Sequence, residues 1–204
     1  MNWTAIVPLK AAARRKQRLS GMLDLRQRIA LSEAMVRHVL STLQSVPMIA
    51  DIHVVSPEPP DAPGLAWLQD RGRGLNGELE AAVSTLGSRP TLILHADLPL
   101  LRPADVQCLI DGATAAGCAI SADRHRRGTN AIALTDPRGF QFRFGVGSFR
   151  RHCVVAGPAC AVIDRPGLTF DCDTTDDLAA IRAMGLDLVE AIGSPTTPRR
   201  AARP

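Results

Sequence analysis

The chain has 204 residues, of which 46% are hydrophobic and 22% are charged, and its formal net charge is +4. This length fits one domain with a sizeable core, which we expect over residues 1–192. No apolar run is long enough to cross a bilayer, and the first residues lack the features of a signal peptide. Five cysteines without a C-x-x-C pair argue against a disulfide framework or structural zinc site, so a cytoplasmic location is expected.

Most of the net positive charge, +3 of +4, lies outside the expected domain. Residues 193–204 carry Arg199, Arg200 and Arg203 and no acid, and their low apolar content predicts a disordered basic tail. A nucleic-acid-binding protein would instead show a basic face within its fold. The other basic cluster, residues 14–18, is short and suits a small polyanion such as a nucleoside triphosphate. Neither a nucleic acid nor a membrane is therefore an expected partner.

The first half of the chain predicts alternating strands and helices. Apolar runs predict strands at residues 3–9, 51–56 and 91–96. Helical spacing of apolar residues predicts helices at residues 25–43, 76–86 and 103–116. Asp24 is a start signal for the first of these helices, and Pro103 fits the first turn of the third. Residues 10–20 are expected to form a loop.

The second half is richer in short strands. Strands are predicted at residues 118–122, 131–135, 161–164 and 169–172, with a further extended piece at 140–144. Helices are predicted at 148–156 and 174–184, the second opened by a capping box of Thr174 and Asp177. This alternation predicts a three-layer α/β domain with a mostly parallel sheet. Ligands of such sheets bind at the carboxyl ends of the strands, so the loops after residues 9, 96 and 172 should meet in one cleft.

The loop after the first strand, PLKAAARRKQRL at residues 8–19, is the first candidate for chemistry. It has neither the G-x-x-x-x-G-K-[ST] pattern of a P-loop nor the G-x-G-x-x-G pattern of a dinucleotide-binding fold. A solvated run of charge is one interpretation. Its position after the first strand of an α/β sheet favours the other, a flexible cationic loop that wraps a triphosphate.

Three aspartates are candidate metal ligands. Asp97 follows a buried strand directly, and carboxylate oxygens are the hard ligands that Mg²⁺ prefers. Asp171 and Asp173 are two residues apart in an expected extended segment, so both face one side while Cys172 faces the other. Two close carboxylates favour a cation between them. The alternative is a turn role for Asp97 and a helix-capping role for Asp173.

Two glycine-containing turns are candidates for binding a second anion. They are GTN at residues 128–130 and GVGS at 145–148, the latter at the start of a predicted helix. Glycine lets backbone N–H groups approach an anion, and a helix start adds a positive dipole end. Ordinary turn chemistry explains them equally well. His95, which precedes Asp97, and His152, one helical turn after Ser148, are either site residues or packed core residues.

Taken in order, these motifs resemble the guanylyltransferase family of coenzyme F-420 biosynthesis. The ordered set is PLKAAARRKQRL, GLN, LHADLPLL, RGTNAIAL, FGVGSFRRH and DCDTTDDL, within residues 3–190. The specific part is the succession of GTN, G-x-x-S-F-x-x-H and D-x-D-T-x-x-D-L. Members of that family are 2-phospho-L-lactate guanylyltransferases, and some use phosphoenolpyruvate or 3-phospho-D-glycerate.

The resemblance implies a three-layer Rossmann-like nucleotidyltransferase fold of the nucleotide-diphospho-sugar transferase type, with a mixed, mostly parallel sheet. It implies GTP as the donor, Mg²⁺ (two ions) as the cofactor and pyrophosphate as the leaving group. A downstream transferase of the same pathway becomes a candidate partner. The implied nucleotide ligands are Lys16, Arg18, Gly74 and Asn76, with Lys16 and Asp97 also taking part in catalysis. The implied metal ligands are Asp97, Asp171 and Asp173, and the implied acceptor-binding residues are Thr129, Gly145 and Ser148.

Three other interpretations stay open. A molybdenum-cofactor type nucleotidyltransferase would carry G-G-x-S-x-R-M-G-x-x-K after the first strand, where this chain has PLKAAARRKQRL. A D-x-D glycosyltransferase would normally carry its motif at mid-chain. A non-catalytic nucleotide-binding module is the third. The sequence leaves the choice among the three phospho-acids and the oligomeric state undecided.

Overall fold

A computed structural model describes residues 1–11, 16–60 and 62–193, and in these ranges the chain forms one mixed seven-stranded sheet. The strands are β1 (Trp3–Pro8), β2 (Ile49–Ser56), β3 (Ala66–Gln69), β4 (Thr91–Leu94), β5 (Cys118–Ala122), β6 (Thr129–Leu134) and β7 (Ala161–Val162). Their order in the sheet is β3-β2-β1-β4-β6-β5-β7. Neighbouring strands are parallel except where β6 pairs with β4 and with β5. The predicted mostly parallel sheet is confirmed.

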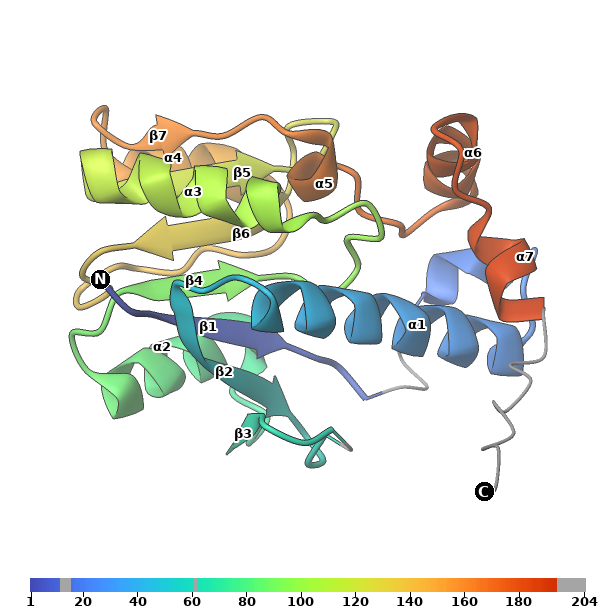
Figure 1. Cartoon of the computed structure of the whole chain (residues 1–204), viewed down its shortest axis with the longest axis horizontal. Coiled ribbons are helices and arrows are strands. Elements are labelled where there is room, and N and C mark those ends of the chain that lie inside the picture. Colours follow the sequence, from blue (N-terminus) through green and yellow to red (C-terminus); the bar gives the residue numbers. More distant parts are fainter. Residues whose placement is uncertain (12–15, 61, 194–204) are drawn as a thin grey trace, which may run out of the picture.

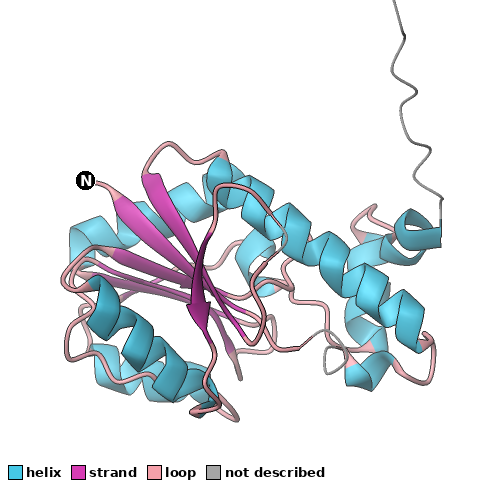
Figure 2. Cartoon of the chain, turned by 90° about the horizontal axis from the view of Figure 1, so that it is seen from below, coloured by secondary structure: helices cyan, strands magenta, loops and turns pink. Residues whose placement is uncertain are grey.

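Helices cover both faces of this sheet, which gives the predicted three layers (Figures 1 and 2). The helices are α1 (Leu25–Gln44), α2 (Gly74–Leu86), α3 (Pro103–Ala116), α4 (Ser148–Ala156), α5 (Pro166–Thr169), α6 (Thr175–Ala183) and α7 (Leu188–Gly193). Buried residues of α1, α3 and α5 pack on one face and those of α2 and α4 on the other. A 3₁₀ turn, Gln17–Leu19, precedes α1. No helix in the described ranges has the length and apolar character needed to span a membrane.

Helix α1 joins the sheet to a third apolar cluster. It starts at Asp24, whose carboxylate accepts from Gln27 N at 2.8 Å while Gln27 Oε1 accepts from Asp24 N at 3.0 Å. This reciprocal capping satisfies backbone donors that the first turn would otherwise leave unpaired. The second half of α1 packs on the sheet, whereas Leu31 and Met35 pack against α6. In Figure 1, α6 and α7 accordingly lie beside the end of α1 that projects past the sheet.

The structure differs from the sequence predictions in several elements. The strand predicted at residues 169–172 is wrong. Pro166 opens α5, which includes Thr169, and residues 170–172 belong to no strand. The segment 140–144 pairs with no strand. Strand β3 and helix α7 were not predicted. The predicted tail lies outside the described residues from 194 onward, and Gly193 is the last residue of α7.

Hydrogen bonds fix α5 and thereby place the residues that follow it. The buried Asp105, in the first turn of α3, accepts from Arg102 N at 2.9 Å and from Arg165 Nε at 2.6 Å. Within α5, Leu168 O accepts from Asn130 Nδ2 at 3.0 Å. Three residues before α6 begins, Cys172 N donates to Asp97 O at 3.0 Å. The chain around Cys172 is therefore tied directly to the loop after β4.

Gly167 provides a test of this anchoring. A Cβ at this position would lie 2.8 Å from Leu100 O and would collide with the Asp105 carboxylate. We therefore expect Gly167→Ala to lower the free energy of unfolding by about 1–3 kcal/mol in denaturant titrations, the usual cost of overpacking. Gly21→Ala is the matched control, since no atom lies within 4 Å of its Cβ. Equal stability of the two variants would contradict the assigned role of α5.

Candidate active site

A cavity of about 800 Å³ opens at the carboxyl ends of β1, β2 and β4, a volume typical of small-molecule sites. Its walls come from the loop after β1, the start of α2, the loop after β4 and the segment before α6. The charged and polar lining residues are Lys10, Lys16, Gln17, Arg18, Ser32, Asp70, Glu78, His95, Asp97 and Asp173. The predicted meeting of the loops after the first strand, after residue 96 and after residue 172 is confirmed.

The ammonium of Lys16 holds these loops together. Lys16 Nζ lies 2.9 Å from Asp97 Oδ2 and 2.8 Å from Asp173 Oδ1. The side chain is 4% exposed, and the Lys16 backbone adopts a left-handed conformation with φ of 54°. A non-glycine residue in this region is held there by its surroundings, often at a functional site.

Apolar packing brings Lys16 and Asp173 close together. Leu19, three residues after Lys16, and Cys172, next to Asp173, are both fully buried in the cluster beneath the first half of α1. Cys172 faces this cluster while Asp171 and Asp173 are half-buried at its edge. The predicted opposite facing of Cys172 and the two carboxylates thus agrees with the burial pattern, although the segment is not a strand.

The charges of this cluster perturb each other strongly. Burial opposes the charge on Lys16, but the charges of Asp97 and Asp173 and their hydrogen bonds outweigh it and raise the Lys16 pKa. Burial likewise opposes ionisation of Asp97, yet the Lys16 charge lowers the Asp97 pKa. Both groups are therefore ionised at neutral pH, and each stabilises the charge of the other.

The pKa of Asp171 reports the repulsion among the described carboxylates of this cluster. Burial, followed by the charges of Asp97 and Asp173, raises the pKa of Asp171 to about 7. Asp97 Oδ1 is buried and has no hydrogen-bond partner among the described residues. Hard oxygen donors with excess negative charge fit a divalent cation such as Mg²⁺. The described ranges contain no ready-made group of three metal-binding side chains, however, so the three-aspartate site stays a prediction.

The predicted nucleotide residues lie on or next to the cavity wall. Arg18 and Gly74 line the cavity, with Gly74 as the first residue of α2. Asn76 is instead bound to the backbone of Phe144, accepting from its N at 2.8 Å and donating to its O at 3.3 Å. Sequence reasoning therefore placed Asn76 near the site but missed the partner of its side chain.

Glu78 is a cavity residue that sequence reasoning missed. Its Oε1 accepts from the backbone N–H groups of Arg71 and Arg73, each at 2.9 Å, and its Oε2 accepts from Arg73 Nη2 at 2.7 Å. The Arg73 side-chain hydrogen bond, assisted by the two backbone bonds, lowers the Glu78 pKa to about 2 against the effect of burial. Glu78 thus shapes the turn that leads into Gly74. An acid in the first turns of a helix was the signal available.

The predicted acceptor residues gather around the start of α4. Ser148 is the first residue of α4, and its N–H donates to Gly145 O at 3.0 Å. Thr129 opens β6, and its hydroxyl lies 2.9 Å from Nδ1 of His152, one turn further along α4 than Ser148. Because β6 is antiparallel to β4, its first residues lie beside the end of β4, where His95 N donates to Asn130 O at 2.9 Å. The GTN turn therefore reaches the same edge of the sheet as Asp97.

Aromatic and histidine rings connect the loop after β4 to the start of α4. His95 stacks on Phe144 with 5.2 Å between ring centroids, and Phe144 contacts His152 edge-on at 4.7 Å. The remaining aromatic residues of this loop, Phe140 and Phe142, continue the contacts. The alternating F-x-F-x-F pattern at 140–144 was the available sequence signal, and the segment was predicted only to be extended.

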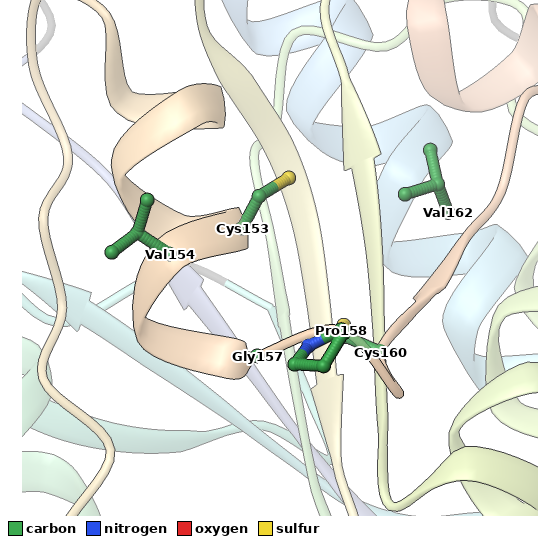
Figure 3. A pocket seen from close by; sticks show the side chains of 6 residues that line it. All are labelled: Cys153, Val154, Gly157, Pro158, Cys160 and Val162. Carbon is green, nitrogen blue, oxygen red and sulfur yellow. The ribbon is translucent and has the colours of Figure 1, made fainter.

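A second, smaller pocket of about 360 Å³ lies between the end of α4 and β7 (Figure 3). It is lined by Cys153, Val154, Gly157, Pro158, Cys160 and Val162. None of these side chains is a lysine, arginine, histidine, aspartate or glutamate, so this pocket lacks the charged groups of the first cavity. The charged cavity is the candidate active site.

Comparison with known proteins agrees with this geometry. Residues 3–189 match the family model described as guanylyl transferase CofC like. The chain is 38% identical over 213 residues to a phosphoenolpyruvate guanylyltransferase of Rubrobacter xylanophilus, covering 98% of this chain and 100% of that protein. It is 33% identical to a protein of the same name from Chloroflexus aggregans, covering 84% of this chain and 93% of that protein.

Solved structures share the fold at low sequence identity. A protein from Desulfovibrio desulfuricans G20 described as a nucleotide-diphospho-sugar transferase superposes with a TM-score of 0.73 at 16% identity, over 91% of this chain and 88% of that chain. A nucleotidyl transferase from Methanothermobacter superposes with a TM-score of 0.66 at 14% identity, over 93% and 99% of the two chains. These likenesses confirm the predicted nucleotide-diphospho-sugar transferase type of fold. With the family match over nearly its whole length, the chain belongs to the CofC-like guanylyl transferase family.

Proposed function

We propose that this protein transfers GMP from GTP to the phosphate of a small phospho-carboxylic acid in coenzyme F-420 biosynthesis. An acceptor phosphate oxygen attacks the α-phosphorus of GTP, the bond from that phosphorus to the β-phosphate bridging oxygen breaks, and pyrophosphate leaves. The observation that carries this proposal is the Lys16 ammonium between Asp97 and Asp173 on the wall of a nucleotide-sized cavity. Phosphoenolpyruvate is the acceptor that we favour, because the relatives from Rubrobacter xylanophilus and Chloroflexus aggregans are named phosphoenolpyruvate guanylyltransferases.

Lys16 and Arg18 are assigned to the triphosphate. An ammonium has three N–H donors, of which Asp97 and Asp173 take two. Because Lys16 also lines the cavity, we assign its third donor to a phosphate oxygen. Its raised pKa keeps the charge in place throughout the reaction. Gly74 lets the backbone at the start of α2 approach the nucleotide, and Asn76 contributes by fixing the Phe144 backbone beside it.

Asp97, Asp171 and Asp173 are the residues that would hold Mg²⁺, two ions in our proposal. When bound, Mg²⁺ supplies positive charge that screens two anionic substrates from each other. The repulsion among the described carboxylates, visible in the raised pKa of Asp171, supports this assignment. The protein's own task is then to hold the reacting groups in line, which needs no protein nucleophile.

Thr129, Gly145 and Ser148 are assigned to the acceptor. Ser148 stands at the start of α4, where N–H groups and the helix dipole favour an anion. Gly145 has φ of 114°, a conformation that is open to glycine and lets its backbone approach a ligand. Both positions suit a carboxylate or phosphate of the small acid.

The proposed function is tested by incubating the protein with GTP, Mg²⁺ and each of phosphoenolpyruvate, 2-phospho-L-lactate and 3-phospho-D-glycerate. We expect pyrophosphate and a GMP adduct with at least one acid, and the highest kcat/KM for phosphoenolpyruvate. CTP and UDP-glucose serve as donor controls. Transfer from the sugar nucleotide, or no adduct with any of the three acids, would overturn the proposal.

Replacing Asp173 tests the carboxylate cluster. Asp173→Asn removes one of the two carboxylate charges that contact the Lys16 ammonium, and it also removes one proposed metal ligand. We therefore expect kcat to fall by about 100-fold or more in the pyrophosphate assay. Asp176→Asn, an exposed acid in the first turn of α6, is the matched control and should keep near-normal turnover. A normal kcat for Asp173→Asn in a folded protein would exclude the assigned role.

Asp171 should also control the pH dependence of stability. Its folded pKa of about 7 exceeds the value of about 3.9 in an unfolded chain, so its stabilising contribution is present at low pH and is lost as pH rises through 7. Relative to the wild type, Asp171→Asn should gain about 1–3 kcal/mol of unfolding free energy between about pH 4.5 and pH 8, after allowance for solvent screening. Denaturant titrations with a chelator present would measure this gain. A pH-independent difference from the wild type would contradict the crowding of carboxylates.

A further inference from the structure

His152 is a buried histidine with a defined partner at each ring nitrogen. Its side chain is 0% exposed. Nε2 accepts a hydrogen bond from Arg143 N at 2.8 Å, and Nδ1 lies 2.9 Å from Thr129 Oγ1. One partner comes from the loop that contains the aromatic residues and the other from the first residue of β6.

The backbone partner determines where the ring proton lies. The N–H of Arg143 can only donate, so Nε2 must present its lone pair. A neutral imidazole then carries its single proton on Nδ1. Burial, followed by the charges of Arg151 and His95, lowers the His152 pKa to about 4, so the ring is neutral at physiological pH. Nδ1–H therefore donates to Thr129 Oγ1.

Packing keeps the ring in this orientation. Phe144 meets it edge-on with 4.7 Å between centroids, and Phe140 stacks near it at 6.1 Å. Turning the ring over would replace Nε2 by Cε1 opposite the Arg143 N–H and leave this buried donor without a partner, which is costly. The direction of the hydrogen bond to Thr129 is thus fixed by the fold.

This direction has a consequence for Thr129. A hydroxyl that accepts from His152 keeps its own hydrogen available as a donor to something else. We propose that His152 is a positioning residue that sets the Thr129 hydroxyl as a hydrogen-bond donor to an anionic oxygen of the acceptor acid. The inference rests on the proposed function, because it takes Thr129 as a contact of the acceptor. It explains why the histidine of the G-x-x-S-F-x-x-H motif follows Ser148 by one helical turn.

The tautomer can be measured without any turnover. Long-range ¹H–¹⁵N NMR spectra of the full-length protein, assigned with a His152→Gln variant, should show a neutral His152 ring protonated at Nδ1. An Nε2-protonated or doubly protonated ring at neutral pH would overturn the inference whatever the enzyme catalyses.

Two substitutions separate the two hydrogen bonds of His152. His152→Gln keeps an acceptor near the Nε2 position for Arg143 N and removes the donor to Thr129, whereas His152→Asn keeps a donor near Nδ1 and removes the acceptor. We expect His152→Gln to raise the KM for the acceptor about tenfold and to leave the KM for GTP unchanged, since one bond to a charged group is affected. His152→Asn should retain more acceptor affinity than His152→Gln. An equal rise in both KM values, or none, would contradict the positioning role.

Thr129 variants complete the test if a histidine variant is unstable. Thr129→Ser should retain the acceptor KM and Thr129→Val should raise it about as much as His152→Gln does. In the double variant the effects should not add, because the histidine acts through the threonine. Additive effects would show independent roles and overturn the inference. If the wild type uses none of the phospho-acids, the proposed function and the role of Thr129 both fail, while the NMR result still reports on the tautomer.

Discussion

One buried ammonium organises the candidate site. Lys16 contacts Asp97 after β4 and Asp173 before α6, so three distant parts of the chain meet at a single charge. Desolvating these groups costs free energy that their mutual attraction must offset, and losing one partner would leave an uncompensated buried charge. The apolar packing of Leu19 and Cys172 brings the partners within reach, and the ion pairs then fix their positions. Packing therefore brings the charged groups close together, and the ion pairs determine their final positions at the cavity wall.

The direction of β6 supplies the second constraint. In an all-parallel sheet, the residues that open a strand lie at the edge opposite the ligand. Because β6 runs antiparallel to β4, Thr129 and Asn130 open a strand and still lie beside His95. The loop that carries Phe144 then joins this region to α2 through the two hydrogen bonds of Asn76. The regions assigned to the nucleotide and to the acceptor thus share one rigid connection.

Local signals account for what the sequence predicted well. The capping residues Asp24 and Thr174 and the first-turn Pro103 depend only on neighbours along the chain, and the helices they open are present. The convergence of Lys16 with Asp97 followed from the rule for strand ends. The partners of Asn76 and His152, in contrast, are set by tertiary contacts that no local pattern encodes. Thr169 and Phe170 have strand propensity, but Pro166 and the anchoring of α5 by Asp105 override it.

The carboxylates of the site are arranged at a cost to the folded protein. Asp171 is half-buried beside two other acids, and its raised pKa means that ionising it near neutral pH opposes folding. A core built only for stability would replace such a residue, because unpaired buried charge is among the most destabilising features of proteins. A cation that binds the folded state and not the unfolded chain recovers this free energy by mass action. The repulsion among the described carboxylates next to Lys16 therefore supports our proposal that they belong to a site that binds a cation.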